Sequence, residues 1–214
     1  MPEYQLYLFD FDYTLVNSEA AILKCFHLTL AEQGLFDPGD EVIRHTIGLP
    51  MLKACGIILG TEDEQQIRAF IKHYTVNADR YMTAGTRFYP HTVATLQALR
   101  QTGAQLGIIS SKTRHRIQEK FVQDGVPDLI DYILGSDDVK EHKPSPEGIN
   151  KALAHFQLPP ASVLYTGDSY VDAGAAQNAG VAFAGVTTGT TTAAELAAYP
   201  HVAIIQDISE LTNL

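Results

Sequence analysis

Residues 5–15 read QLYLFDFDYTL, a short apolar run that ends abruptly in an acidic pair. The run at residues 5–9 is typical of a buried strand. Asp10 and Asp12 follow it directly, and residues two apart in an extended chain point to the same side. Two close carboxylates repel each other, so they need a proton or a cation between them. Taken by itself, the motif suits either a reactive site or a solvated turn that Asp12 caps.

Similar apolar runs recur along the chain and alternate with helical patterns. We expect further strands at residues 106–109, 132–134, 163–165 and 181–186, and helices at 92–101, 113–123, 146–156 and 170–179. This alternation predicts an α/β fold, a doubly wound parallel sheet covered on both faces. Such sheets bind ligands at the carboxyl ends of their strands, which is where the acidic pair stands.

One segment breaks the alternation. From residue 17 to residue 80 the chain shows helical patterns and no strand. We expect a helix at 18–33 stopped by Gly34, and another at 62–80 with Thr61 as its N-cap. Between them lies a shorter helical stretch, 40–60, broken by the turn-like IGLP. The sequence therefore predicts a core domain of residues 1–16 and 81–214, and an inserted helical cap domain of residues 17–80.

The composition narrows the classes of partner. The formal net charge is −10 over 214 residues, so the surface repels a phosphodiester backbone and nucleic acid is not expected. No apolar stretch approaches a membrane span, and the N-terminus shows no signal-type pattern, so we expect a cytoplasmic protein. Cys25 and Cys55 are interpreted as small core residues. Monomer and homodimer stay open.

Ser110 and Lys143 stand at two further positions where a site would form. Ser110 closes the run LGIIS, and its hydroxyl would donate to a phosphoryl oxygen, although a helix N-cap is the alternative, which Ser111 equally suits. Lys143 lies in HKPSPE, where the prolines stiffen the chain. It would be a fixed cation that binds both a phosphoryl oxygen and Asp10; a solvated surface lysine is the alternative.

The last motif is TGDSYVD, residues 166–172, in which an apolar strand again ends in acid. Asp168 and Asp172 are four residues apart and share a face if a helix starts promptly. Hard oxygen ligands of this kind suit Mg²⁺. A helix-start acid that interacts with the dipole is the alternative for Asp172. The four motifs in this order together favour a phosphate site.

These motifs resemble the haloacid dehalogenase-like (HAD) hydrolase superfamily. The matching stretches are DFDYTL (10–15), the run that closes on Ser110, KPSPE (143–147) and TGDSYVDAGAAQNAG (166–180). The resemblance spans essentially the whole chain and is closest to the phosphoglycolate phosphatase-like branch. That branch carries a helical cap after the first motif, as is expected here.

The resemblance implies a role for each motif residue. Asp10 would attack phosphorus and form an aspartyl-phosphate, and Asp12 would protonate the leaving group and then activate water. Ser110 and Lys143 would hold the transferring phosphoryl group. Phosphoryl transfer asks mainly for positioning and charge neutralisation, which agrees with these roles.

The resemblance also implies Mg²⁺ as the cofactor. Its ligands would be the carboxylates of Asp10 and Asp168 and the backbone carbonyl of Asp12. Asp172 would hold these ligands in place without touching the metal, or would contact the metal through a water molecule.

Two positions depart from the family pattern. Tyr13 and His91 stand where glycine is common, which bears on specificity rather than on chemistry. Possible substrate contacts are Tyr13, Ser111, Arg44, His45 and Lys53.

The function that the resemblance implies is a Mg²⁺-dependent phosphatase acting on a small phosphorylated metabolite, such as phosphoglycolate, a sugar phosphate or pyrophosphate. Asp12 argues for a leaving group that needs a proton. A sugar phosphomutase of the β-phosphoglucomutase type is the alternative within the family, with Arg44, His45 and Lys53 as phosphate ligands of the cap. A non-catalytic phosphate-binding or receiver-like regulatory protein is the alternative of another class.

Overall fold

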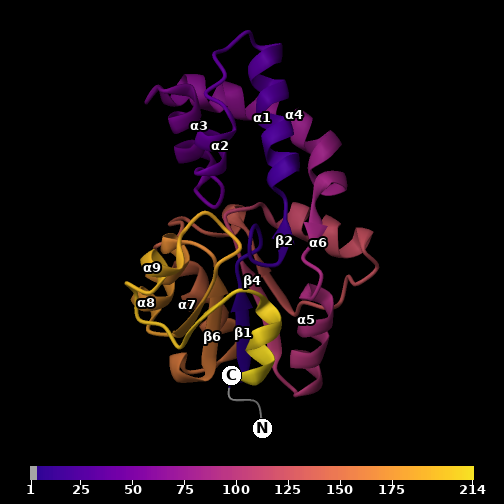
Figure 1. Cartoon of the computed structure of the whole chain (residues 1–214), viewed down its shortest axis with the longest axis vertical. Helices are drawn as coiled ribbons and strands as arrows, with labels where there is room; N and C mark the ends of the chain where they lie inside the picture. The colour runs from indigo at the N-terminus through magenta and orange to yellow at the C-terminus, as the bar shows by residue number, and fades with distance from the viewer. Residues whose placement is uncertain (1–3) are drawn as a thin grey trace. The chain divides into compact units, whose positions relative to one another are not determined.

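The computed structural model describes residues 4–214, which form two compact units (Figure 1). One unit consists of the chain up to Val16 together with Phe88–Leu214, and the other is Asn17–Arg87. The chain passes from one to the other within β2 (Val16–Asn17) and returns within β3 (Arg87–Phe88). The insertion ends after residue 87 rather than residue 80, because α4 (Glu64–Gly85) continues beyond the expected helix end.

A six-stranded parallel sheet forms the centre of the first unit, in the order β5-β4-β1-β6-β7-β8. In register, Phe9 of β1 lies opposite Ile108 of β4 and Thr166 of β6. The strands are β1 (Leu6–Phe9), β4 (Gln105–Ile109), β5 (Tyr132–Leu134), β6 (Val163–Gly167), β7 (Ala182–Val186) and β8 (Ala203–Ile205). The five expected strands and the doubly wound α/β class are confirmed, whereas β8 was not predicted.

Helices cover both faces of this sheet (Figure 1). Tyr7 and Phe9 pack on one face, and Leu6 and Leu8 on the other, because successive side chains of a strand alternate. Burial on both faces explains why β1 is apolar throughout. The first face carries α5 (Thr92–Gln101), α6 (Arg114–Gln123) and η3 (Ile208–Asn213); the second carries α7 (Glu147–Phe156), α8 (Tyr170–Ala179) and α9 (Ala193–Leu196).

The strand order brings the polar motifs to one edge. After β1 the sheet grows through β4 to β5, and then the chain returns to the opposite side of β1 with β6. Ligands of open α/β sheets bind at such a reversal, outside the carboxyl ends of the strands. The strands β1, β4 and β6 are each followed directly by one residue of these motifs: Asp10, Ser110 and Asp168.

The inserted unit is entirely helical between the two crossings, with its own core. Phe26 stacks on Phe70 and tilts against Tyr74, so the helices α1 and α4 pack together through aromatic rings. Cys25 and Cys55 are free and buried in the same cluster, as predicted. Its helices are α1 (Glu19–Glu32), α2 (Asp40–Arg44), α3 (Met51–Leu59) and α4 (Glu64–Gly85).

The N-cap of α4 is Asp63, not Thr61. Asp63 accepts hydrogen bonds from the backbone N–H groups of Gln65 and Gln66, which would otherwise lack partners at the helix start. Thr61 instead accepts from the backbone N–H of Asp63. Among residues 4–214, no helix is long and apolar enough to cross a membrane.

Candidate active site

Asp10 is held at the end of the central strand. Its backbone N–H donates to the carbonyl of Thr166 over 2.9 Å, which continues the ladder between β1 and β6 by one residue. The side chain is only 3% exposed. A buried carboxylate needs a charged or hydrogen-bonding partner.

That partner is Lys143. Its Nζ donates to Asp10 Oδ1 over 2.8 Å and to Asp172 Oδ1 over 2.6 Å, and contacts the hydroxyl of Tyr165 at 3.2 Å. Lys143 is itself buried. The ammonium therefore bridges two carboxylates from different elements, and the alternative of a solvated surface lysine is wrong.

Burial and the neighbouring charges shift the pKa values of both Asp10 and Lys143. Burial raises the pKa of Asp10 to about 6, with Lys143 opposing the rise and the Asp172 carboxylate adding to it. Burial alone disfavours the ammonium of Lys143, but the charges of Asp10 and Asp172 outweigh burial and raise its pKa above the usual range. Lys143 is thus a permanent cation beside a carboxylate that is predominantly ionised at neutral pH.

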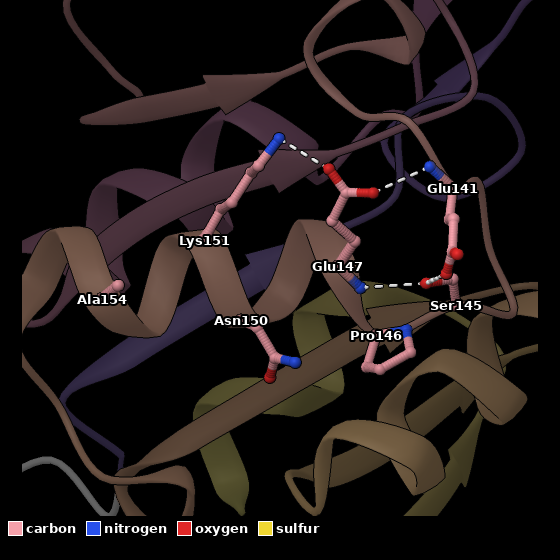
Figure 2. A pocket seen from close by; sticks show the side chains of 7 residues that line it. All are labelled: Glu141, Ser145, Pro146, Glu147, Asn150, Lys151 and Ala154. Atoms are coloured by element: carbon pink, nitrogen blue, oxygen red, sulfur yellow. Dashed lines mark hydrogen bonds and ion pairs between the residues drawn. The ribbon is translucent and has the colours of Figure 1, made fainter.

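The loop that carries Lys143 is tied to the start of α7 (Figure 2). The Glu147 carboxylate accepts from the backbone N–H groups of Lys140 and Glu141 and from Lys151 Nζ. The Lys151 bond and then the two backbone bonds lower the pKa of Glu147 to about 2. Glu141, Glu147 and Lys151 line a surface pocket (Figure 2). The bonds of Glu147 join the two ends of the loop. Glu147 therefore keeps Lys143 in a loop of fixed shape.

Asp172 has two structural roles at once. Its Oδ2 accepts from the backbone N–H of Ser169 over 3.1 Å and from the Ser169 hydroxyl, which forms a capping box at the start of α8. Its Oδ1 accepts from Lys143 and, over 2.9 Å, from the Tyr165 hydroxyl. The helix-start interpretation is right, and the same side chain also orients the buried lysine.

Asp168 completes a cluster of three carboxylates. Each of Asp10, Asp168 and Asp172 contributes one carboxylate oxygen, and these three oxygens lie within 4.8 Å of one another. Burial, and then the charges of Asp172 and Asp10, raise the pKa of Asp168 well above its usual range. One lysine does not balance three buried acids, and their hard oxygens suit a divalent cation such as Mg²⁺. The residues present fit the cofactor that the family implies.

Two neighbours shape the surroundings of Asp168. The Thr14 hydroxyl donates to its Oδ1 over 3.2 Å. A β-carbon at Gly189 would lie 1.9 Å from its Oδ2, so no other residue fits there without displacement. The loop after β7 therefore closes tightly on this carboxylate.

Asp12 is paired with a lysine that the sequence did not single out. Lys112 Nζ donates to both carboxylate oxygens of Asp12, over 2.7 and 2.8 Å. The two side chains are 9% and 10% exposed. Asp12 therefore has a fixed cationic partner of its own, separate from the Lys143 bridge.

Ser110 follows β4 directly and is buried. It is not the N-cap of the next helix, since α6 begins at Arg114 with Thr113 at the cap position. Its Oγ instead accepts from the backbone N–H of Lys112 over 3.3 Å. Ser111 is half-buried beside it. The N-cap alternative for both serines is thus wrong.

Tyr13 adopts the left-handed backbone conformation, with φ of 60°. Bulky residues seldom adopt it, whereas glycine does so freely. A glycine, which the family resemblance leads us to expect at this position, would adopt this conformation without strain. The Tyr13 side chain is buried rather than exposed, and its carbonyl accepts from the Thr188 hydroxyl.

The other candidate contacts lie apart in the chain. Arg44 and His45 in the inserted unit are bound by neighbours: Arg44 Nε lies 3.0 Å from Glu19 Oε1, and His45 Nδ1 lies 3.0 Å from the carbonyl of Glu41. Lys53 is exposed on α3. His91 precedes α5 with φ of −98°, a conformation that does not require glycine. Roles of Arg44, His45 and Lys53 in substrate binding stay predictions.

Three members of the site were missed by the sequence interpretation: Thr14, Lys112 and Tyr165. Thr14 and Lys112 had a signal, because each lies two residues beyond a motif residue, Asp12 or Ser110. Tyr165 had none, since a tyrosine inside a buried strand is usually interpreted as core. Its ring is fully buried, and its hydroxyl reaches the polar cluster.

Comparison with known proteins agrees with this geometry. The family model described as haloacid dehalogenase-like hydrolase matches residues 7–186. A phosphoglycolate phosphatase from Rhodobacter capsulatus is 33% identical over 97% of this chain and 94% of its own. The pyrophosphatase PpaX from Oceanobacillus iheyensis is 28% identical over the same shares. A crystal structure of a protein from Bacteroides fragilis, assigned to the haloacid dehalogenase-like hydrolases, superposes with a TM-score of 0.94 at 43% identity, covering 97% of this chain and 99% of the other.

The fold, the acidic site and the matched residues together place the chain in one family: it belongs to the haloacid dehalogenase-like hydrolases. Within that family it falls in the phosphoglycolate phosphatase-like branch, and its enzyme class is that of a phosphatase.

Proposed function

We propose that this protein is a Mg²⁺-dependent phosphatase that hydrolyses a small phosphorylated metabolite through an aspartyl-phosphate on Asp10. The observation that carries the proposal is the bridge in which buried Lys143 binds Asp10 at 2.8 Å and is held from behind by Asp172 at 2.6 Å. A carboxylate fixed by a permanent cation at the carboxyl edge of the sheet suits a nucleophile toward phosphorus.

In the first step, an Asp10 carboxylate oxygen attacks phosphorus while the bond between phosphorus and the leaving oxygen breaks. Asp12 gives its proton to that oxygen, so the leaving group departs as a neutral alcohol or as a protonated acid. Lys143 and Ser110 hold the phosphoryl oxygens and offset the charge that gathers on them.

In the second step, water attacks the phosphorus of the aspartyl-phosphate. Asp12, now a carboxylate, takes the proton of that water, and the bond between phosphorus and the Asp10 oxygen breaks. Inorganic phosphate leaves, and Asp10 and Asp12 return to their starting states.

The metal would be held by the side chains of Asp10 and Asp168 and by the backbone carbonyl of Asp12. Asp172 is the weaker candidate, because both of its oxygens already accept bonds from Lys143, Tyr165 and Ser169. When bound, Mg²⁺ supplies positive charge to the phosphoryl oxygens and to the acidic cluster.

The substrate class follows from the relatives together with the site. The relatives named above act on phosphoglycolate or pyrophosphate, so we propose a compact phosphorylated metabolite for this chain. The helical insertion, Asn17–Arg87, is proposed to act as the cap over this substrate, with Arg44, His45 and Lys53 as candidate contacts. A cytoplasmic location stays a prediction.

The test is release of inorganic phosphate from a panel containing phosphoglycolate, pyrophosphate, sugar phosphates and an aryl phosphate, with Mg²⁺ or with chelator. We expect Asp10→Asn to lower the rate by at least about 10³-fold, because an amide does not replace the nucleophile. The exposed Asp128→Asn is the matched control.

Equal rates for wild type and Asp10→Asn would remove the proposed nucleophile. A sugar phosphate converted to an isomer without net phosphate release would identify a phosphomutase instead. No turnover of any compound, combined with no phosphate analogue bound at Asp10, would favour a non-catalytic regulatory protein.

A further inference from the structure

Lys112 forms a two-point contact with Asp12 that the mechanism above does not use. Its Nζ lies 2.7 Å from Oδ1 and 2.8 Å from Oδ2. Both side chains are nine-tenths buried, so little water competes for the pair. An ammonium that spans both oxygens fixes the plane of the carboxylate as well as its position.

The backbone of Lys112 is anchored to the loop after β5. Its carbonyl accepts from the backbone N–H of Ser136 over 3.0 Å. A β-carbon at Gly135 would lie 2.8 Å from the same carbonyl, so the two loops approach as closely as glycine allows. Next to it, Arg114 donates to both carboxylate oxygens of Asp138, over 2.8 and 2.6 Å. The lysine therefore projects from a rigid base.

Asp12 is anchored independently on the other side of the pair. The backbone N–H of Tyr13 donates to the carbonyl of Val16 over 2.8 Å, and the Tyr13 carbonyl accepts from the Thr188 hydroxyl. Lys112 Nζ also lies 5.7 Å from the ring centre of buried Phe11, within cation–π range. The backbone is thus fixed at both ends of the ion pair. The ion pair in turn restricts rotation of the Asp12 side chain.

We propose that Lys112 is a positioning residue that aims the Asp12 carboxylate at the leaving-group oxygen and later at the attacking water. It does this without touching the transferring phosphoryl group, which Lys143 and Ser110 hold. The proposal rests on the proposed function, in which Asp12 moves the proton in both steps.

The proposal predicts a dependence on the leaving group. An alkyl phosphate needs a proton on its leaving oxygen, whereas 4-nitrophenyl phosphate releases a stable phenolate without one. If the Asp12 carboxyl group is turned away from the leaving oxygen, the first step becomes slower for the alkyl ester only. It slows hydrolysis of the aspartyl-phosphate for every substrate, because that step always uses Asp12.

The experiment compares wild type, Lys112→Met and Lys112→Arg on phosphoglycolate and 4-nitrophenyl phosphate with Mg²⁺. For Lys112→Met we expect kcat/KM to fall about 100-fold for phosphoglycolate but less than about fivefold for the aryl ester. A burst of nitrophenolate, absent in wild type, is expected in rapid mixing because the intermediate accumulates. Lys112→Arg recovers part of the loss, since its planar fork also matches two carboxylate oxygens.

Lys140→Met is the matched control, because Lys140 is exposed in the same unit and its side chain lies outside the site. Thermal unfolding of each variant shows whether a loss of activity comes from loss of the folded structure or from altered orientation of Asp12. An equal loss of kcat/KM on both substrates, or a Lys112→Met variant indistinguishable from wild type, overturns the positioning role. Failure of wild type itself to release phosphate instead overturns the proposed function, and the two failures are therefore distinct.

Discussion

Tyr165 and Asp172 both contact the buried Lys143 and support its position. The Tyr165 hydroxyl lies 3.2 Å from Lys143 Nζ, 2.9 Å from Asp172 Oδ1 and 3.1 Å from the carbonyl of Ile109. Burial, and then the negative charges of Asp172 and Asp10, raise the pKa of Tyr165, so the hydroxyl keeps its proton. A neutral hydroxyl that both donates and accepts is suited to hold a lysine between two acids.

We therefore expect Tyr165→Phe to lower kcat about tenfold while KM changes little, because Lys143 loses one partner and its aim at Asp10 loosens. The ring still fills the core, so the free energy of unfolding should fall by only about 1 kcal/mol. Steady-state kinetics and urea unfolding check both values. Tyr170→Phe, at an exposed tyrosine of α8, is the control. An unchanged kcat for Tyr165→Phe would show that Asp172 alone orients the lysine.

At the scale of elements, α8 presses directly against the loop that carries Lys143. A β-carbon at Gly174 would lie 2.9 Å from Pro144 Cβ, and one turn later Asn178 donates to the Pro144 carbonyl over 2.9 Å. The residue next to the lysine is therefore held by a helix that begins with the capping box of Ser169 and Asp172. Helix position and lysine position are coupled.

Gly174→Val should push this loop away from α8. We expect kcat/KM to fall at least about tenfold, because displacing a catalytic group by a fraction of an ångström removes its alignment. The crowding should also lower the free energy of unfolding by about 1–3 kcal/mol. Gln177→Val, on the exposed side of the same helix, is the control. If both variants retain full activity, the helix does not set the position of Lys143.

At the scale of the whole molecule, the chain crosses between its two units only twice among the described residues. Both crossings are two-residue strands, β2 and β3, which pair with each other in a two-stranded sheet. Short connections between units with separate cores are where an enzyme of this class is expected to open and close.

We expect amide hydrogen exchange around residues 15–17 and 86–88 to slow about tenfold when Mg²⁺ and a phosphate mimic such as orthovanadate are added, because closure restricts opening at the crossings. The edge strand β8 (Ala203–Ile205) serves as the internal control, as it lies within the core sheet. Exchange at the crossings that is identical with and without the mimic would contradict closure by the insertion.

Much of the fold was predictable because its signals are local. The apolar runs that end in acid mark β1 and β6 directly, and the helical periodicity of residues 92–101 matches α5. The expected end of α4 at residue 80 was wrong, since no glycine or proline interrupts the helix before Gly85, where it ends. β8 was missed because a three-residue edge strand resembles any short apolar segment.

By itself, the sequence determined the α/β class, the helical insertion and the positions of the motifs that define the family, because each depends on residues close together in the chain. The contact between Lys143 and Asp10, 133 positions apart, was expected from the motifs. Only the tertiary structure decided which other charges meet: Lys143 also binds Asp172, 29 positions away, and Lys112 reaches Asp12 across 100 positions. Such pairs leave no periodic trace in the sequence, since the strand order of the sheet alone brings them to one edge.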